Sequence, residues 1–269
     1  MVIQRIAAGT ILSFVFFLCI LQTANAGYSM TPLVVTLDLS SRNPSGEVLL
    51  KSEKGDAKIP MAIELKVKGR EVALDGSKVL YHEDKSADNF VVYPSQIVLL
   101  PGESQRVQIK WVGESMPKKE ISYGLIAEQA PVKLGDEDKP RTKAEGRLYI
   151  LIKYEGIILV RPAGVKPNTV VDSAGPMVDS TGKAHLVVLL NNTGTARQVL
   201  KGAKFQVTPV DKSGNMVVNE SVAYKPDIPD SQIWQKLYAG YRRQLNIPWP
   251  ENVPVGPVRV TVEFEPAEK

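Results

Sequence analysis

Apolar and polar positions alternate in many short segments of this chain, and this period of two predicts β-strands. In Met61–Lys68 the apolar side chains stand at 63, 65 and 67, between charged ones at 64, 66 and 68. Similar segments recur at 34–39, 47–51, 90–93, 96–100, 105–111, 121–127, 185–190, 199–207, 241–247 and 258–264. Turn pairs such as Asp75-Gly76 and Pro101-Gly102 separate them. The pattern therefore predicts an all-β protein made of antiparallel sandwiches.

The longest apolar segment is Leu148–Pro162, which follows a polar segment, 133–146, that we expect to be a loop. Its even positions are apolar, namely Leu148, Ile150, Ile152 and Tyr154, whereas Lys153 and Glu155 fall on the odd face. A strand this long and apolar must be covered. Either it is a core strand of its own sandwich, or a partner protein covers it.

The strand pattern breaks at Arg161-Pro162-Ala163-Gly164, so we place a domain boundary there. The expected domains are an N-terminal sandwich over 27–162 and a C-terminal sandwich over 163–269. Residues 1–26 have the order of a secretory signal peptide: Arg5, an apolar run over 11–21, and Ala24-Asn25-Ala26 as the cleavage site. We expect cleavage after Ala26. The alternative is a single N-terminal membrane anchor, for which the apolar run is short.

Composition narrows the function to binding. The one cysteine, Cys19, lies in the signal segment, so the exported chain lacks disulfides and thiol chemistry. The net charge of +4 is spread among both signs without a basic run, which argues against nucleic acid as a partner. His82 and His185 have no partners at catalytic or metal-binding spacing, and no nucleophile elbow or phosphate loop is present.

The sequence therefore predicts a protein that is not an enzyme, without a metal or other cofactor. Two alternatives stay open. One is an exported β-sandwich that is itself an adhesive or structural surface component, in which the Leu148 strand is buried internally. The other is a carbohydrate-active β-sandwich enzyme, because acidic residues are abundant enough to supply a carboxylate pair.

Several motifs carry a family resemblance. Segment 89–109 contains Pro94 followed by Leu-x-Pro-Gly-x-x-Gln-x-Val over 99–107, and 123–129 resembles the strand that follows in the family. Leu148–Pro162 resembles the last strand of its first domain, and 191–194 and 238–243 are similar to second-domain signatures. In this order the motifs resemble the PapD-like periplasmic chaperones that assemble pili, or fimbriae, in the chaperone–usher pathway.

The resemblance implies two immunoglobulin-like sandwiches arranged as a boomerang. It also implies donor-strand complementation, in which the chaperone lends its last first-domain strand to a pilus subunit that lacks one and delivers the subunit to an outer-membrane usher. The side chains that fill the subunit groove would be Leu148, Ile150 and Ile152, with Tyr154 as a fourth. The location would be the periplasm, without stable membrane insertion. Without a subunit, the exposed apolar strand would favour self-association.

The chain departs from the family at one point. Members carry an Arg on the first strand and a Lys four positions before the closing Arg-Pro, and these two hold the terminal carboxylate of the subunit. Here the positions fall at Val34 and Ile157. Lys153 is the nearest substitute and a candidate carboxylate anchor, although it also fits a solvent-facing lysine. Arg161 and Pro162 are expected to tie the domains together. The departure places the chain in a divergent branch, archaic or alternative.

Overall fold

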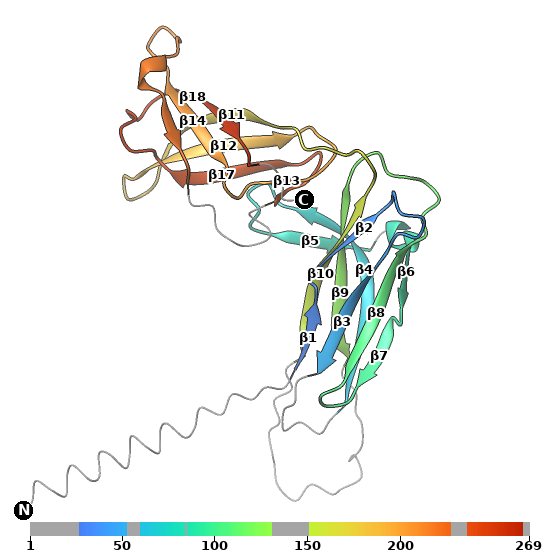
Figure 1. Ribbon diagram of the computed structural model, residues 1–269. Coiled ribbons are helices and arrows are strands. Elements are labelled where there is room, and N and C mark those ends of the chain that lie inside the picture. The colour runs from blue at the N-terminus through green and yellow to red at the C-terminus, as the bar shows by residue number, and fades with distance from the viewer. Residues whose placement is uncertain (1–26, 53–59, 84, 131–150, 227–235, 266–269) are drawn as a thin grey trace, which may run out of the picture.

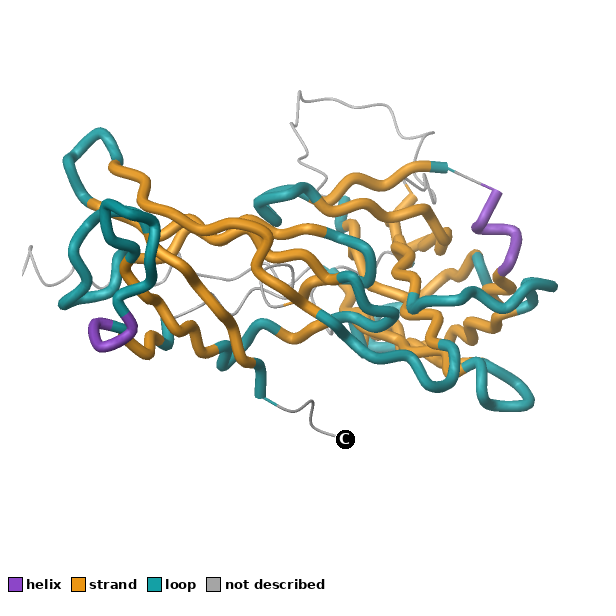
Figure 2. Tube along the Cα trace, turned by 90° about the horizontal axis from the view of Figure 1, so that it is seen from above, coloured by secondary structure: helices purple, strands orange, loops and turns teal. Residues whose placement is uncertain are grey.

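A computed structural model describes residues 27–52, 60–83, 85–130, 151–226 and 236–265. It shows two β-lobes set at an angle, which gives a boomerang outline (Figure 1). Strands are the main elements of both lobes, with loops and turns between them (Figure 2), and the helical elements in the described ranges are two short 3₁₀ turns, Lys85–Asn89 and Val218–Glu220. The prediction of an all-β protein with two sandwiches is confirmed.

The N-terminal lobe consists of two facing sheets. In chain order its strands are β1 (Tyr28–Thr31), β2 (Val34–Asp38), β3 (Ser45–Ser52), β4 (Met61–Val72), β5 (Val79–His82), β6 (Phe90–Tyr93), β7 (Gln96–Leu99), β8 (Ser104–Trp111), β9 (Ile121–Ala130) and β10 (Lys153–Arg161). One sheet has the order β1-β3-β8-β6 and the other β2-β10-β9-β4-β5, with β7 also paired to β4.

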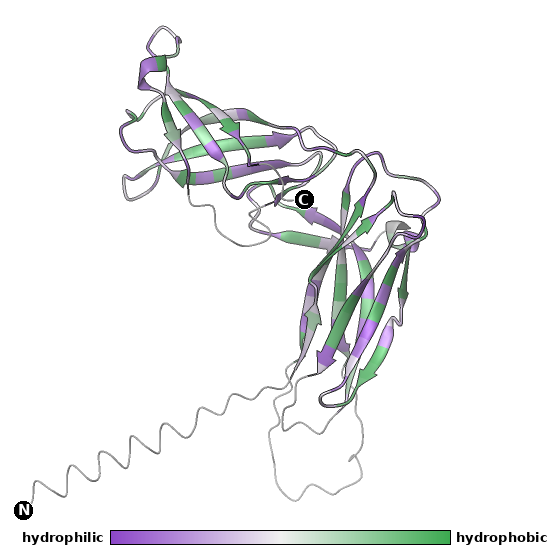
Figure 3. Ribbon diagram, viewed as in Figure 1, coloured by the Kyte–Doolittle hydropathy of each residue, from purple (hydrophilic) through white to green (hydrophobic). Residues whose placement is uncertain are grey.

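The alternation seen in the sequence places the core between these sheets. In β4, Ile63, Leu65 and Val67 are buried as predicted, and the charged residues between them lie on the outer face. Figure 3 shows the resulting mixture of hydrophobic and hydrophilic residues along the strands. Phe90 packs edge to face against both Trp111 and Tyr123, with ring centroids 5.1 and 4.8 Å away, and so joins the two sheets through the core.

The chain changes sheets between β1 and β2. β1 pairs with β3 in the first sheet, a cis Thr31–Pro32 peptide follows, and β2 then pairs with β10 in the second sheet. The parallel pairing of β2 with β10 begins only at Ile157. As a result, none of the strands that the structure describes in this lobe pairs with the part of β10 before Ile157 on the side away from β9.

The C-terminal lobe is a smaller sandwich. Its strands are β11 (Thr169–Val178), β12 (Ala184–Asn192), β13 (Gln198–Val199), β14 (Lys204–Pro209), β15 (Val222–Tyr224), β16 (Lys236–Leu237), β17 (Arg242–Pro248) and β18 (Val258–Glu263). Sheets β11-β12-β17 and β15-β14-β18 enclose a core that includes Leu186, Leu190 and Phe205. The single strand expected over 199–207 was wrong, because a turn with Gly202 at φ 75° separates β13 from β14.

The two lobes meet through an apolar cluster. Ile157 and Leu159 of β10 point outward from the N-terminal sheet and are covered by Tyr238 of the C-terminal lobe, with Val72 beside them. The hairpin between β4 and β5 adds a second contact, since the backbone N–H of Gln244 donates to the carbonyl of Leu74 at 2.9 Å. The C-terminal lobe therefore covers the outer face of the β2-β10-β9-β4-β5 sheet at one end.

Candidate functional site

The backbone edge of β10 is open over Lys153–Gly156. From Lys153 to Val160 this strand pairs with β9, and from Ile157 onward it also pairs with β2, where the Ile157 N–H donates to the Leu33 carbonyl at 2.7 Å. The carbonyl of Ile152 accepts from Gln129 N–H on β9 at 3.1 Å. Because successive backbone groups point to opposite sides of a strand, those of Lys153 and Glu155 point away from β9.

No strand in the described ranges pairs with that side of Lys153–Gly156. We call this stretch the open edge. Unpaired N–H and C=O groups in a row are the template to which a strand of another chain can add.

The even face of this strand is continuous with the N-terminal core. Ile158 and Val160 are fully buried in it, and Tyr154 and Ile152 pack against its margin. Leu148 and Ile150 lie outside the described residues, as does the expected loop at 133–146. The apolar row predicted from the sequence therefore begins in the core and runs toward its margin. Its role in filling a partner's groove stays a prediction for all four residues.

The odd face of the strand carries Leu151, Lys153 and Glu155, all exposed. The Nζ of Lys153 lies 2.7 Å from Oε1 of Glu155, and this hydrogen bond raises the pKa of Lys153. Lys153 and Arg161 are eight positions apart, which at strand spacing is about 26 Å. Lys153 thus lies beside the open edge, at the far end of β10 from the domain interface, and its role as a carboxylate anchor stays a prediction.

Arg161 takes part in a contact between the lobes. Its Nε lies 3.7 Å from Oε2 of Glu120, whose side chain is buried. The same carboxylate accepts from Arg197 of the C-terminal lobe, from the backbone N–H at 3.2 Å and from Nη1 at 3.3 Å. Glu120 therefore joins one arginine from each lobe. Pro162 follows directly, between the end of β10 and the start of β11.

Val34 and Ile157, the two positions at which the family resemblance leads us to expect basic residues, face each other in the β2–β10 register. Ile157 belongs to the interdomain apolar cluster, and Val34 packs against that cluster. Tyr238 of the C-terminal lobe is a member of the same cluster. An apolar contact between the lobes thus occupies the place expected for a basic pair.

A basic residue that the sequence reasoning missed lies beside this cluster. Arg70 of β4 is 5 % exposed, its Nη1 donates to Ser122 Oγ at 3.3 Å, and its Cζ lies 4.8 Å from the ring centroid of Tyr238. In the sequence Arg70 continues the charged outer positions of β4 and looks like a solvated residue. It is buried because the C-terminal lobe covers this end of the sheet, which no local pattern reveals.

Arg70 lines an open hollow of about 390 Å³ on the N-terminal lobe beside the contact between the lobes, which we call the interdomain pocket. Its walls are 69–71, His82, 121–123 and Tyr241. Tyr81 lies next to Arg70 on the same face, and its hydroxyl interacts with both Arg70 and Glu155. Burial is the main cause that raises the pKa of Tyr81, followed by the charge of Glu155. A polar network thus runs from the open edge to the pocket.

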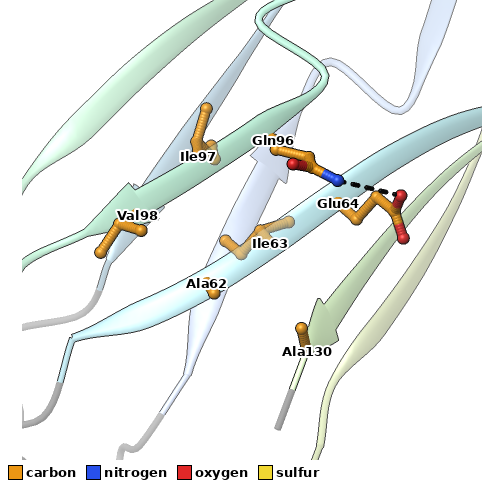
Figure 4. A pocket seen from close by; sticks show the side chains of 7 residues that line it. All are labelled: Ala62, Ile63, Glu64, Gln96, Ile97, Val98 and Ala130. Carbon is orange, nitrogen blue, oxygen red and sulfur yellow. Dashed lines mark hydrogen bonds between the residues drawn. The ribbon is translucent and has the colours of Figure 1, made fainter. Parts of the chain in front are cut away.

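A second hollow, of about 340 Å³, lies on the outer face of β4, β7 and β9 (Figure 4). Gln96 donates to Glu64 there at 3.4 Å, and Val98 is largely exposed. Hydrogen bonding to Lys66, 2.9 Å away, is the main cause that lowers the pKa of Glu64. Glu64 is the one acidic residue among the described residues that line this hollow.

In the described part of the chain, no group of three or more His, Cys, Asp or Glu could hold a metal ion. None of the helices in the same ranges is long and apolar enough to cross a membrane. The signal segment and its cleavage site fall among residues 1–26, outside those ranges.

Comparison with solved structures identifies the fold. A chain from a chaperone–tip adhesin complex of CFA/I fimbriae biogenesis matches with a TM-score of 0.52 and 17 % identity, over 91 % of this chain and 95 % of that one. The class 5 fimbriae chaperone CfaA matches with a TM-score of 0.51 and 17 % identity, over 90 % and 95 %. No family model and no curated protein sequence matches the chain. The resemblance predicted from the motifs is thus confirmed at the level of the two-domain fold.

Proposed function

We propose that this protein is a periplasmic, non-enzymatic chaperone that binds pilus subunits by donor-strand complementation and delivers them to an outer-membrane usher. The observation that carries the proposal is the open edge of β10, where the backbone groups of Lys153 and Glu155 point away from β9. The two-domain fold shared with fimbrial chaperones supports it.

The open edge suits a partner whose sheet lacks a strand. Main-chain hydrogen bonds bind such a partner with little dependence on its sequence, and alternate side chains fill its groove. Here the even positions would supply them, namely Ile152 and Tyr154, which pack against the core, together with Leu148 and Ile150. Each buried aliphatic side chain contributes about 1.5–3 kcal/mol before the cost of ordering is subtracted.

The position of the even face next to the N-terminal core also favours burial of the apolar groove of the partner. Ile158 and Val160 continue the even face into the N-terminal core, so an added subunit would extend a sandwich that already exists. The export signal over 1–26 would bring the chain to the periplasm, where both subunits and usher are met. Without a subunit, the uncovered apolar row would promote self-association.

The backbone test uses a matched pair at Glu155. Glu155→Pro removes the N–H that points outward at the open edge, whereas Glu155→Ala removes the side chain and keeps that N–H. The protein is co-expressed with fimbrial subunits, and complexes are isolated by a tag on the chaperone. We expect capture by the natural protein and by Glu155→Ala, and loss of capture with Glu155→Pro. Equal capture by a folded Glu155→Pro variant would overturn strand addition at this edge.

The side-chain test uses Ile150→Asp/Ile152→Asp. Aspartates at these positions would place two charges in an apolar groove, so the complex should not form. Because Ile152 packs against the chaperone's own core, thermal unfolding of the variant is measured first, and Ile150→Asp alone serves as the variant that leaves this contact in place. Complex formation by both folded variants would exclude these side chains from the groove.

A further inference from the structure

We infer that Pro176 closes the edge of the C-terminal lobe to strand addition, and that without this proline two copies of the chain would pair through β11. The inference goes beyond the proposed function and does not depend on it, because it concerns contacts between copies of this chain. It rests on the exposure of β11, on the direction of its backbone groups and on the absence of a donor at Pro176.

β11 is the longest edge strand that the structure describes in the C-terminal lobe. It pairs with β12 on one side, and no strand in the described ranges pairs with it on the other. Most of its residues are exposed, among them the apolar Val170, Met177 and Val178. Its second half, 173–178, contains no charged residue. An exposed and uncharged edge strand is a template to which another chain can add.

The backbone groups of Pro176 point away from β12. In an antiparallel pair of strands, residues that exchange hydrogen bonds with the facing residue alternate with residues that do not. Just beyond β11, the Asp179 N–H donates to the Lys183 carbonyl at 3.0 Å, so this pair is hydrogen-bonded. Counting back along the register from this pair, Val178, Pro176 and Ala174 face the open side.

The facing strand gives the same assignment. Ala184, the register partner of Val178, accepts through its carbonyl from the Trp249 N–H at 3.3 Å, on the β17 side of the sheet. The backbone of Ala184 therefore points away from β11, and Val178 is left with its groups on the open side. At Pro176 the open side has a carbonyl but no N–H, because proline lacks the donor.

Two copies would pair in antiparallel fashion about a two-fold axis, the commonest symmetry of homodimers. Residues that face the open side must stand opposite each other, so Ala174 of one copy would face Val178 of the other and Pro176 would face Pro176. The central pair needs two N–H groups that donate to two carbonyls, and proline supplies neither. Both carbonyls would be buried without a donor, which disfavours the dimer.

A β-bulge interrupts the same edge further back. The register shifts between Val171 and Ser173, which leaves Asp172 as the extra residue. Its carboxylate lies 3.1 Å from Nε of Arg242 on β17. Bulges and prolines are devices that protect the edges of natural sheets, and here they divide β11 into stretches of three residues or fewer. The open edge of β10 over Lys153–Gly156 contains neither device.

The test restores the missing donor. Pro176→Val returns an N–H to the centre of the edge, and since Pro176 is exposed, the C-terminal lobe should stay folded. All proteins compared also carry Glu155→Pro, so that strand addition at the open edge of β10 does not contribute. We expect sedimentation velocity to show a dimer for Pro176→Val, with a dimerisation constant at least about 10-fold higher than with Pro176, because two hydrogen bonds are gained.

Two control variants separate the backbone from the side chain. Gly175→Val adds the same side chain at the neighbouring position, where nothing lies within 4 Å of the added Cβ, and it keeps Pro176. Pro176→Val/Val178→Pro returns a proline to a residue that faces the open side. Both controls should stay monomeric. If Pro176→Val does not fold, as judged by circular dichroism, Pro176→Thr restores the same N–H and takes its place.

Hydrogen exchange locates the contact. In the dimer, the amides of Ala174 and Val178 should become protected as the protein concentration rises. A folded Pro176→Val protein that stays monomeric would overturn the inference, and so would equal dimerisation of Gly175→Val. A dimer in which these two amides remain unprotected would show that the copies meet elsewhere, which also contradicts it.

Discussion

The hydroxyl of Tyr154 donates a hydrogen bond to the backbone carbonyl of Tyr28 at 2.7 Å, and the two rings meet edge to face with their centroids 5.0 Å apart. Tyr28 in turn donates from its own hydroxyl to the Ala127 carbonyl at 2.7 Å. This pair links β1 of one sheet to β10 and β9 of the other. It therefore closes the N-terminal sandwich at the end where the open edge begins.

Removing the Tyr154 hydroxyl should destabilise this end of the sandwich. Tyr154→Phe keeps the ring contact and loses one hydrogen bond, so we expect a loss of about 1 kcal/mol in the free energy of unfolding. Tyr154→Ala also loses the ring, and because the side chain is partly buried we expect about 2–4 kcal/mol. Urea unfolding measures both. Tyr93→Phe, at a largely exposed tyrosine, is the control and should leave the stability unchanged. If Tyr154→Phe is as stable as the natural protein, the hydrogen bond to Tyr28 contributes nothing to stability.

Stability should fall at alkaline pH through Tyr28. Burial, and then the charge of a neighbouring Tyr154, raise the pKa of Tyr28 above its ordinary value of 10. The folded state therefore holds the neutral phenol more strongly than the unfolded state does. The contribution of Tyr28 to the free energy of unfolding is complete below pH 10. It is lost as the pH rises toward the elevated pKa of the folded state.

Tyr28→Phe provides the measurement. At pH 7 the variant should be less stable by about 1 kcal/mol, because the bond to Ala127 is lost. Above pH 10 its free energy of unfolding should fall less steeply than that of the natural protein, so the gap between the two should narrow. Parallel curves for the two proteins across this range would show that Tyr28 does not titrate with folding.

The strands could be predicted because their signal is local. Alternation in β4 and the apolar residues of β10 follow directly from which side chains face the core, and Phe90–Tyr93 was predicted with its observed bounds. β11 was missed because Gly175 and Pro176 interrupt it and most of its residues are exposed, so no alternation is present. The strand expected over 199–207 failed at a turn whose one local signal was Gly202.

The candidate site could be predicted only in part, for a different reason. The apolar row on the even face is a property of one strand and is visible in the sequence. The open edge depends on where β2 begins to pair, and the buried state of Arg70 depends on how the second lobe covers the sheet. Both are relations between segments far apart in the chain. Lys153 can therefore be recognised in the sequence as a basic residue of β10, whereas the burial of Arg70 on β4 cannot.

The contact between the lobes should weaken when Glu120 loses its charge. Glu120→Gln keeps the shape of the side chain but removes the attraction to Arg161 and Arg197, and its amide N–H₂ faces donors. Since the Glu120 carboxylate is buried, we expect a loss of about 1–3 kcal/mol. Calorimetry should show the two lobes unfolding in more clearly separated transitions. As a control, Glu47→Gln removes an exposed pair with Arg106 and should change stability by less than about 1 kcal/mol. A single unchanged transition for Glu120→Gln would contradict a role of Glu120 in holding the lobes together.

Gly76 is the residue at which the β4–β5 hairpin meets Arg243, and an alanine there should separate the lobes locally. Gly76 has a φ of 72°, which disfavours any side chain, and a Cβ at this position would collide with the Arg243 guanidinium. Arg243 is almost fully buried, so it has little freedom to move aside. Gly182→Ala is a matched control, because its φ of 83° imposes similar backbone strain and nothing lies within 4 Å of the added Cβ.

The difference between these two variants isolates the collision. Backbone strain alone should cost each about 1 kcal/mol, and Gly76→Ala should lose roughly 1–3 kcal/mol more because of overpacking against Arg243. Hydrogen exchange should also become faster at Gln244, whose N–H bonds to the Leu74 carbonyl of the same hairpin. If the two variants lose equal stability and Gln244 keeps its protection, the hairpin does not hold the C-terminal lobe through Arg243.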